Sequence, residues 1–310
     1  MKKLSVVFFG TPDFSVASLE LLHHHPLIDL KLIVSMPDRP AGRGMELKSP
    51  EVIEYAKKNK LPFIQTESIN KDEEFKKIYQ ALEIDFCLVI AFAQFLGESV
   101  LAKPRLGCFN IHTSLLPKYR GAAPIQYALL NGDTFTGVSI QKMVKKMDAG
   151  DIAHLHEVAI DPNETSGLLF TRLKFQAALA LNDFISKLHK NKISYQAQDE
   201  SNVSFAPVIK KEDGQLKFAE ETSEQIINKI RAFDPWPGTF CFLNDKRMKV
   251  IRAEIYHRKL NPGESQNDLG SLVVGTKNGS LRLSWIQLEG KKACSDKELL
   301  NGLKSDIKLT

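Results

Sequence analysis

The stretch Asp85-Phe-Cys-Leu-Val-Ile-Ala-Phe92 continues after its first residue as an unbroken apolar run, which predicts a buried β-strand. Toward the N-terminus, we predict further strands at residues 4–9, 30–35 and 62–65, and helices at residues 51–60 and 72–82. Because strands alternate with helices in this part of the chain, we expect a doubly wound α/β fold with a parallel sheet.

On the C-terminal side, the next predicted strand begins at Cys108, and two more follow at residues 137–143 and 152–160. A long helix is predicted at residues 165–189. Its apolar stripe includes Leu168 and Leu169, together with Leu173, Ala177, Leu181, Phe184 and Leu188. This helix is long enough to close a first domain.

A chain of 310 residues suggests two domains. Residues 190–206 are mostly polar and lack helical periodicity, which predicts a linker. Residues 207–310 contain a predicted helix and several short strands separated by turn residues, which is typical of a small OB-like β-barrel. We therefore expect a catalytic domain at residues 1–189 and a β-barrel domain at residues 207–310.

The bulk composition is that of an ordinary folded protein, with 25% charged and 43% hydrophobic residues and a net charge of +5. The apolar run near the N-terminus is too short for a signal peptide, and no run approaches the length of a membrane span. The four cysteines are far apart and form no C-x-x-C motif. We expect a cytoplasmic protein without membrane contact.

Two polar side chains interrupt the apolar strand that begins at Cys108. Asn110 and His112 are two positions apart, so in a strand they point to the same face. An amide can donate to a developing oxyanion, and an imidazole, with an unperturbed pKa of ~6.5, exchanges protons near neutrality. Asp148 follows the next strand along, and it is expected near His112 because ligands collect at the carboxyl ends of such strands. An isolated Asn-x-His pair is more often structural, so its surroundings must decide.

Other familiar site types lack support. The first strand ends in Gly10-Thr-Pro-Asp13, which matches neither the dinucleotide fingerprint nor the phosphate loop. His23, His24 and His25 are consecutive on a predicted helix and cannot converge on one ion. We expect no metal.

Two basic regions predict contact with a polyanion. The long connection Pro37-Asp-Arg-Pro-Ala-Gly-Arg-Gly44 exposes Arg39 and Arg43, whose guanidinium groups suit phosphate. Residues 207–310 carry 18 Lys and Arg against 14 Asp and Glu. Lys246, Arg247 and Lys249 are among the cations that cluster there, and they predict a surface for a nucleic-acid backbone.

Several separated motifs together resemble the bacterial methionyl-tRNA formyltransferase family along essentially the whole chain. They are Gly10-Thr-Pro-Asp-Phe14, Pro37–Gly44, Asn110-Ile-His112, Ser114-Leu-Leu-Pro117, Arg120-Gly-Ala-Ala-Pro124, Met147-Asp-Ala-Gly150, Pro235-Trp-Pro-Gly238 and Gly290-Lys-Lys292. The resemblance implies a Rossmann-like catalytic domain. It also implies transfer of a formyl group from 10-formyltetrahydrofolate to the α-amine of methionyl initiator tRNA, by a bacterial, cytoplasmic enzyme that we expect to be a monomer.

The resemblance also implies roles for residues. Asn110 and protonated His112 would stabilise the oxyanion, and Asp148 would orient His112, with no covalent enzyme intermediate and no metal. Folate would bind at Phe92, Ala93, Gln94, Phe95, Leu96, Ser114, Leu115, Leu116 and Pro117. The tRNA would bind at Arg39, Arg43, Lys246, Arg247 and Lys249.

Two segments depart from the family pattern. Residues 91–97 read Ala-Phe-Ala-Gln-Phe-Leu-Gly, where family members read closer to Ala-Tyr-Gly-Gln-Ile-Leu-Pro. Met45-Glu46 replaces a common Lys-Lys pair. Pterin recognition in this segment is expected to rely largely on backbone groups, which is compatible with changed side chains at Phe92, Ala93 and Gly97. The Met45-Glu46 pair predicts weaker electrostatic anchoring of tRNA.

Three alternatives stay open. A formyltransferase acting on an amino sugar nucleotide would share Asn110, His112 and Asp148. It would not require the arginines of the Pro37–Gly44 connection or the basic C-terminal region. An RNA-binding protein on a relict enzyme scaffold would not need these three polar residues. A glycinamide-type purine enzyme would need no second domain.

Overall fold

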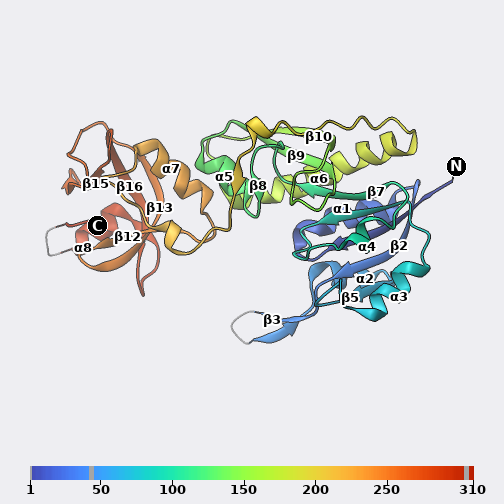
Figure 1. The fold of residues 1–310 in the computed structure, drawn as a ribbon. Coiled ribbons are helices and arrows are strands. Elements are labelled where there is room, and N and C mark those ends of the chain that lie inside the picture. The colour runs from blue at the N-terminus through green and yellow to red at the C-terminus, as the bar shows by residue number, and fades with distance from the viewer. Residues whose placement is uncertain (1, 42–44, 304–306) are drawn as a thin grey trace. The chain divides into compact units, whose positions relative to one another are not determined.

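The computed structural model describes residues 2–41, 45–303 and 307–310. The chain divides into two compact units, which are described separately (Figure 1). The first unit comprises Met1–Gly121, Phe135–Ala159 and Phe170–Phe205; the second comprises Ala122–Thr134, Ile160–Leu169 and Ala206–Thr310. Two short segments from within the predicted first domain therefore belong to the second unit. The domain limits drawn from the sequence stay a prediction.

A seven-stranded sheet with the strand order β10-β9-β7-β6-β1-β2-β5 forms the first unit. Its strands are β1 (Leu4–Gly10), β2 (Ile28–Ser35), β5 (Phe63–Gln65), β6 (Phe86–Ile90), β7 (Gly107–His112), β9 (Phe135–Lys142) and β10 (Ile152–Ala159). The five strands from β5 to β7 are parallel, which confirms the predicted α/β fold. The last two differ: β9 runs antiparallel to β7, and β10 runs antiparallel to β9. A short turn joins β9 to β10, and such a connection permits only an antiparallel pair.

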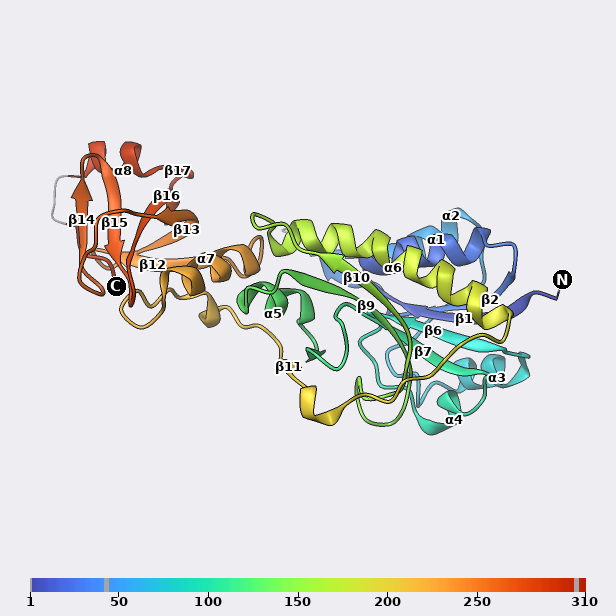
Figure 2. The same cartoon turned by 90° about the horizontal axis from the view of Figure 1, so that it is seen from above.

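Helices cover both faces of this sheet, with α1, α2 and α6 on one side and α3 and α4 on the other (Figure 2). Their bounds are η1 (Asp13–Ser15), α1 (Val16–His24), α2 (Glu51–Lys58), α3 (Glu73–Ala81), α4 (Glu98–Leu101) and α6 (Ser166–His189). Aromatic rings fill both layers: Phe9 packs edge-on against Phe92 with centroids 5.4 Å apart, and Phe109 against Phe184 with centroids 4.8 Å apart.

One residue of the predicted α6 stripe is misplaced. Leu169 is fully buried, but Leu168 is 62% exposed, so its prediction was wrong. Consecutive residues on a helix diverge by about 100°, and the buried face of α6 is too narrow to include both.

The long connection between β2 and α2 contains a hairpin of β3 (Arg39–Ala41) and β4 (Glu46–Lys48), in which Arg39 pairs with Lys48. The sequence pattern had predicted no strands in this connection. Arg43 lies outside the described residues.

The second unit is built around an antiparallel sheet with the order β12-β13-β16-β15-β14, and β17 pairs with β16. Its elements are α5 (Pro124–Leu130), η3 (Glu212–Gly214), α7 (Ser223–Ala232), β12 (Thr239–Leu243), β13 (Lys246–Ile255), β14 (Ser265–Asp268), β15 (Ser271–Gly275), β16 (Ser280–Leu288), β17 (Cys294–Ser295) and α8 (Asp296–Gly302). Its core consists of buried aliphatic side chains from these strands, α7 and α8. The smaller elements β8 (Arg120–Gly121), η2 (Glu200–Asn202) and β11 (Phe205–Ala206) complete the chain.

The last residues of the chain link the two edge strands of this sheet. Thr310 exchanges both backbone hydrogen bonds with Phe242 on β12, at 2.7 and 2.9 Å. The Leu309 N–H donates to Ser265 Oγ on β14 at 3.1 Å. The chain end therefore pairs with β12 through its backbone and is tied to β14 through the Ser265 side chain.

Candidate active site

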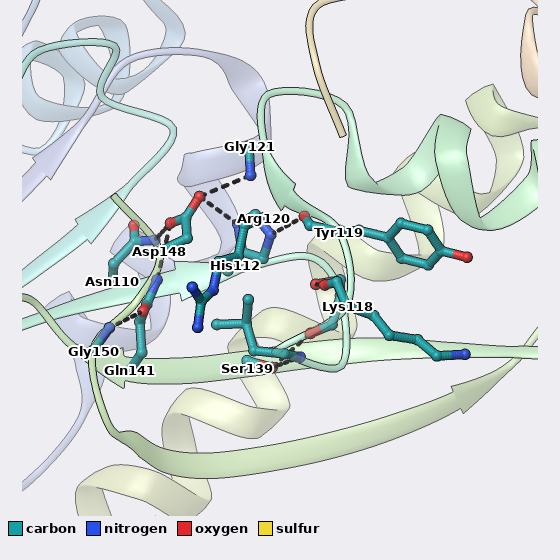
Figure 3. A network of polar contacts seen from close by, with 12 residues as sticks. Asn110, His112, Lys118, Tyr119, Arg120, Gly121, Ser139, Gln141, Asp148 and Gly150 are labelled. Carbon is teal, nitrogen blue, oxygen red and sulfur yellow. Dashed lines mark hydrogen bonds and ion pairs between the residues drawn. The ribbon is translucent and has the colours of Figure 1, made fainter. Parts of the chain in front are cut away.

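Three polar side chains converge at the carboxyl end of β7 (Figure 3). Asn110 and His112 lie on β7, and Asp148 lies in the turn between β9 and β10. Asn110 Nδ2 is 3.5 Å from Asp148 Oδ1, and His112 Nδ1 is 3.8 Å from Asp148 Oδ2. The structure thus brings together the amide, imidazole and carboxylate that the sequence singled out.

The Asp148 carboxylate is held on both of its oxygens. The Gly121 N–H donates to Oδ2 at 3.0 Å, and Gln141 Nε2 donates to Oδ1 at 2.9 Å (Figure 3). The backbone of Asp148 has φ of 50°, a left-handed conformation that aspartate tolerates better than most residues. Such a conformation persists where the surroundings impose it, and it is common at functional sites.

The second ring nitrogen of His112 determines how the ring is oriented. Nε2 lies 2.8 Å from the Tyr119 carbonyl oxygen. A carbonyl can only accept, so Nε2 carries a proton and donates it. Nδ1 therefore faces Asp148, and a proton on Nδ1 would point toward that carboxylate. The ring is 7% exposed, so few other partners compete for it.

The loop after β7 is shaped by its own hydrogen bonds. Ser114 Oγ donates to the Lys118 carbonyl at 2.6 Å, and Ser139 Oγ donates to the Ser114 carbonyl at 2.6 Å while accepting the Leu116 N–H. The Leu116–Pro117 peptide bond is cis. A Cβ on Gly137 would clash with the His156 carbonyl oxygen and would lie 2.5 Å from Leu115 Cδ2, so glycine is needed both for the strand pairing and for this leucine. The predicted folate residues of this loop therefore have fixed positions.

The segment at residues 91–97 presents mainly its backbone. Phe92 and Leu96 are buried in the core, at 2% and 1% exposure. The Gln94 side chain donates to the Thr66 carbonyl and accepts the Ile69 N–H. Ala91 and Ala93 have φ of 49° and 58°, and the left-handed turn at Ala91 ends β6 two residues before the predicted strand end. Only the Phe95 side chain, 54% exposed, is large and accessible here.

The predicted tRNA residues that the structure describes are exposed. The Arg39 side chain is 62% exposed and lies 3.9 Å from a Glu67 carboxylate oxygen. Lys246, Arg247 and Lys249 lie on β13, and the Arg247 guanidinium stacks 3.9 Å from the centroid of the Phe240 ring. Lys249 pairs across the strands with Phe240. Phe240 is itself buried at 8% exposure, so the accessible part of this surface is the cations, which can receive phosphates.

Three residues near Asp148 were not predicted to belong to the site: Gln141, Gln198 and Arg120. Gln141 is 2% exposed and pairs across the strands with Asn110, so both side chains point to one face. The sequence placed Arg120 in a motif without assigning it a role. No local signal identifies the two glutamines, because the first depends on strand register and the second on a remote segment.

Ion pairs extend this network to the surface. Arg120 Nη2 lies 2.8 Å from Glu200 Oε1, and Lys146 Nζ lies 3.1 Å from Glu200 Oε2. The hydrogen bond from Arg120, followed by that from Lys146, holds the pKa of Glu200 below its ordinary value. Glu200, whose side chain is 61% exposed, thus pairs with the buried guanidinium from the solvent side.

Among the described residues, no group of three or more His, Cys, Asp or Glu side chains is arranged to hold a metal ion. All four cysteines are free. No helix in the described part of the chain has both the length and the apolar character that a membrane span requires.

Sequence comparisons match the chain over nearly its whole length. The formyl transferase family matches residues 2–185, and the formyl transferase C-terminal domain matches residues 208–304. A methionyl-tRNA formyltransferase from Thermodesulfovibrio yellowstonii is 38% identical over 299 residues, which cover 96% of this chain and 96% of that protein. A protein of the same name from Thermotoga maritima is 40% identical over 308 residues, which cover 96% of this chain and 95% of that protein.

Solved structures share the fold at lower identity. WlaRD, a sugar 3N-formyl transferase solved in the presence of dTDP and 5-N-formyl-THF, matches with a TM-score of 0.68 at 21% identity over 94% of this chain and 100% of its own. An N-formyltransferase from Helicobacter canadensis, in complex with folinic acid and dTDP-3-aminofucose, matches with a TM-score of 0.66 at 19% identity over 94% and 100%. At these identities the likeness establishes the fold alone.

Proposed function

The chain belongs to the formyl transferase family, and from this premise we propose that it formylates the α-amine of methionine esterified to initiator tRNA, with 10-formyltetrahydrofolate as donor. Relatives named methionyl-tRNA formyltransferase, 38% and 40% identical over nearly the whole chain, support this substrate. The convergence of Asn110, His112 and Asp148 is the observation that carries the proposal, because this set supplies what acyl transfer to an amine requires.

The reaction forms a bond from the methionine nitrogen to the formyl carbon and breaks the bond from that carbon to the folate nitrogen. During attack the formyl oxygen gains negative charge. We assign the Asn110 amide to donate to it, and the protonated His112 ring, whose nitrogens face Tyr119 and Asp148, to stabilise it through its positive charge. The attacking amine loses one proton and the departing folate nitrogen gains one. Asp148 faces the imidazole at 3.8 Å, so its charge favours the cationic ring while the oxyanion exists.

We propose that two segments form the walls of the folate-binding site. One is Phe92, Ala93, Gln94, Phe95 and Leu96, where the burial of the Phe92 and Leu96 side chains leaves mostly backbone groups to recognise the pterin. The other is the loop Ser114, Leu115, Leu116 and Pro117, whose internal hydrogen bonds fix its shape. The changes at residues 91–97 relative to the family pattern are tolerable here, because backbone recognition depends little on side-chain identity.

For the tRNA, we propose contacts to phosphates through Arg39, Arg43, Lys246, Arg247 and Lys249. The described members of this set are exposed, as phosphate contacts require. The proposal also includes a monomeric enzyme in the bacterial cytoplasm, where aminoacyl-tRNAs are made and used.

One competition assay tests the function. The protein is incubated with labelled 10-formyltetrahydrofolate and, in separate reactions, with methionyl initiator tRNA, methionyl elongator tRNA and a dTDP-amino sugar. We expect label on the methionine of the initiator tRNA and none on the sugar. Label on the sugar alone, or on no acceptor, would refute the proposal.

A further inference from the structure

The segment that leaves α6 runs back over the active site. Residues 196–204, which we call the strap, contact both loops that carry the site. Gln196 exchanges two backbone hydrogen bonds with Ile152, just after the Asp148 turn, at 2.8 and 2.9 Å. At the other end, Ser204 accepts the N–H groups of Tyr119 and Arg120, each at 2.9 Å. The strap therefore bridges the Asp148 turn and the loop that binds His112.

Gln198 lies between these two attachments, and its side chain uses all of its polar groups. Its Nε2 donates to the Asp148 carbonyl at 2.9 Å and to the Gly150 carbonyl at 2.7 Å. Its Oε1 accepts from Arg120 Nε at 3.0 Å and from Arg120 Nη2 at 2.8 Å. One amide thus ties the backbone of the catalytic turn to a buried guanidinium.

The Gln198 amide can make these hydrogen bonds in only one of its two orientations. If the Gln198 amide were flipped, its NH₂ group would face the Arg120 donors and its oxygen would face two carbonyl oxygens. Arg120 is itself fixed, because its side chain is 2% exposed and pairs with Glu200. Gln198 is consequently a rigid connection between the strap and the turn.

The turn needs such a connection. Asp148 has φ of 50°, a left-handed conformation that is less favourable for aspartate than for glycine, so contacts around the turn help to maintain it. The Asp148 carboxylate must also stay in front of His112. We infer that Gln198 is a positioning residue for formyl transfer, which acts by holding the backbone of residues 148–150 so that Asp148 faces His112. The inference rests on the proposed function.

The variant Gln198→Glu tests the donor role directly. A glutamate at this position still accepts from Arg120, but it cannot donate, and one of its oxygens would face the two carbonyl oxygens of the turn. Gln196→Glu is the matched control, because it makes the same change two residues away on an exposed side chain. Catalytic groups displaced by about 1 Å lose roughly 10²-fold in rate.

We therefore expect Gln198→Glu to lower kcat by about 10²-fold, with the KM for folate and for tRNA changed by less than about threefold. Gln196→Glu should retain the wild-type kcat. Gln198→Ala should show the same loss of kcat, since it also removes the donor. A kcat near that of wild type in both Gln198 variants, or a loss confined to KM, would overturn the inference.

Hydrogen exchange gives a readout that does not depend on activity. In the full-length protein, Gln198→Glu should accelerate exchange of the amides of residues 148–151 and leave β1 unchanged, whereas Gln196→Glu should leave the turn protected. Unchanged protection of the turn in Gln198→Glu would overturn the positioning role. If the wild type formylates no tRNA, the proposed function fails, and the exchange experiment still decides whether Gln198 holds the turn.

Discussion

Replacing Asp148 by asparagine removes the negative charge beside His112 while preserving the shape of the side chain. The Oδ2 atom lies 3.8 Å from His112 Nδ1, and the two side chains are 11% and 7% exposed. Two unit charges at this separation attract by about 4 kcal/mol at an effective dielectric constant of ~20, and by about 1 kcal/mol at ~80. The site lies between these limits, so the variant should lose between about 5-fold and 10³-fold in kcat.

Hydrogen bonding adds to this loss. In the wild type, Oδ1 accepts from Gln141 and Oδ2 accepts from Gly121. An asparagine can accept on one side only, so one of these donors loses its partner, at a cost of about 1 to 3 kcal/mol if it stays buried. Part of this cost falls on the stability of the turn, and thermal unfolding would reveal it separately.

The assay is steady-state formylation of methionyl-tRNA at saturating folate. Asp151→Asn is the control, because Asp151 is exposed and lies in the same segment, so it undergoes the same change of net charge. We expect the control to match the wild type. If Asp148→Asn keeps kcat within about threefold of the wild type, the electrostatic role assigned to Asp148 is wrong.

Three further predictions follow from the same structure. Asn110→Ala should lower kcat by about 10² to 10³-fold, as loss of one oxyanion donor does, with an unchanged melting temperature; near-normal turnover would remove Asn110 from the mechanism. Lys249→Ala should weaken tRNA binding and reduce the slope of log K against log[salt] by about one, as measured by binding titrations at several salt concentrations. An unchanged slope would exclude a phosphate contact at Lys249. Burial raises the pKa of Asp296, but hydrogen bonds led by that from Arg282 outweigh it, so the pKa is lowered on folding. The ion pair with Arg282 therefore stabilises the folded state above a pH of ~4, and this stabilisation is lost as the pH falls through the folded-state pKa. Asp296→Asn should lower the free energy of unfolding by about 3 kcal/mol at pH 7 and by little in strong acid. An equal loss of unfolding free energy at both pH values would contradict this.

Much of the fold could be predicted from local pattern. The apolar run after Asp85 became the central strand β6, and the alternation around it became a parallel sheet with helices on both faces. Two short elements were missed, although one of them begins at a capping box of Ser295 and Glu298 that is visible in the sequence. The hairpin of β3 and β4 forms within what reads as a loop, and α8 forms at residues 296–302, where no helix was predicted.

The sequence by itself determined that Asn110 and His112 share a face, because the two-residue period of a strand is a local property. The remaining site was decided by the tertiary structure. The register between β7 and β9 places Gln141 beside Asn110, and the return of the strap brings Gln198 to the Asp148 turn. These contacts join residues that are 31 and 50 positions apart, and they depend on strand order and chain path. Local periodicity carries no information about either, so only the folded chain could reveal how the catalytic turn is held.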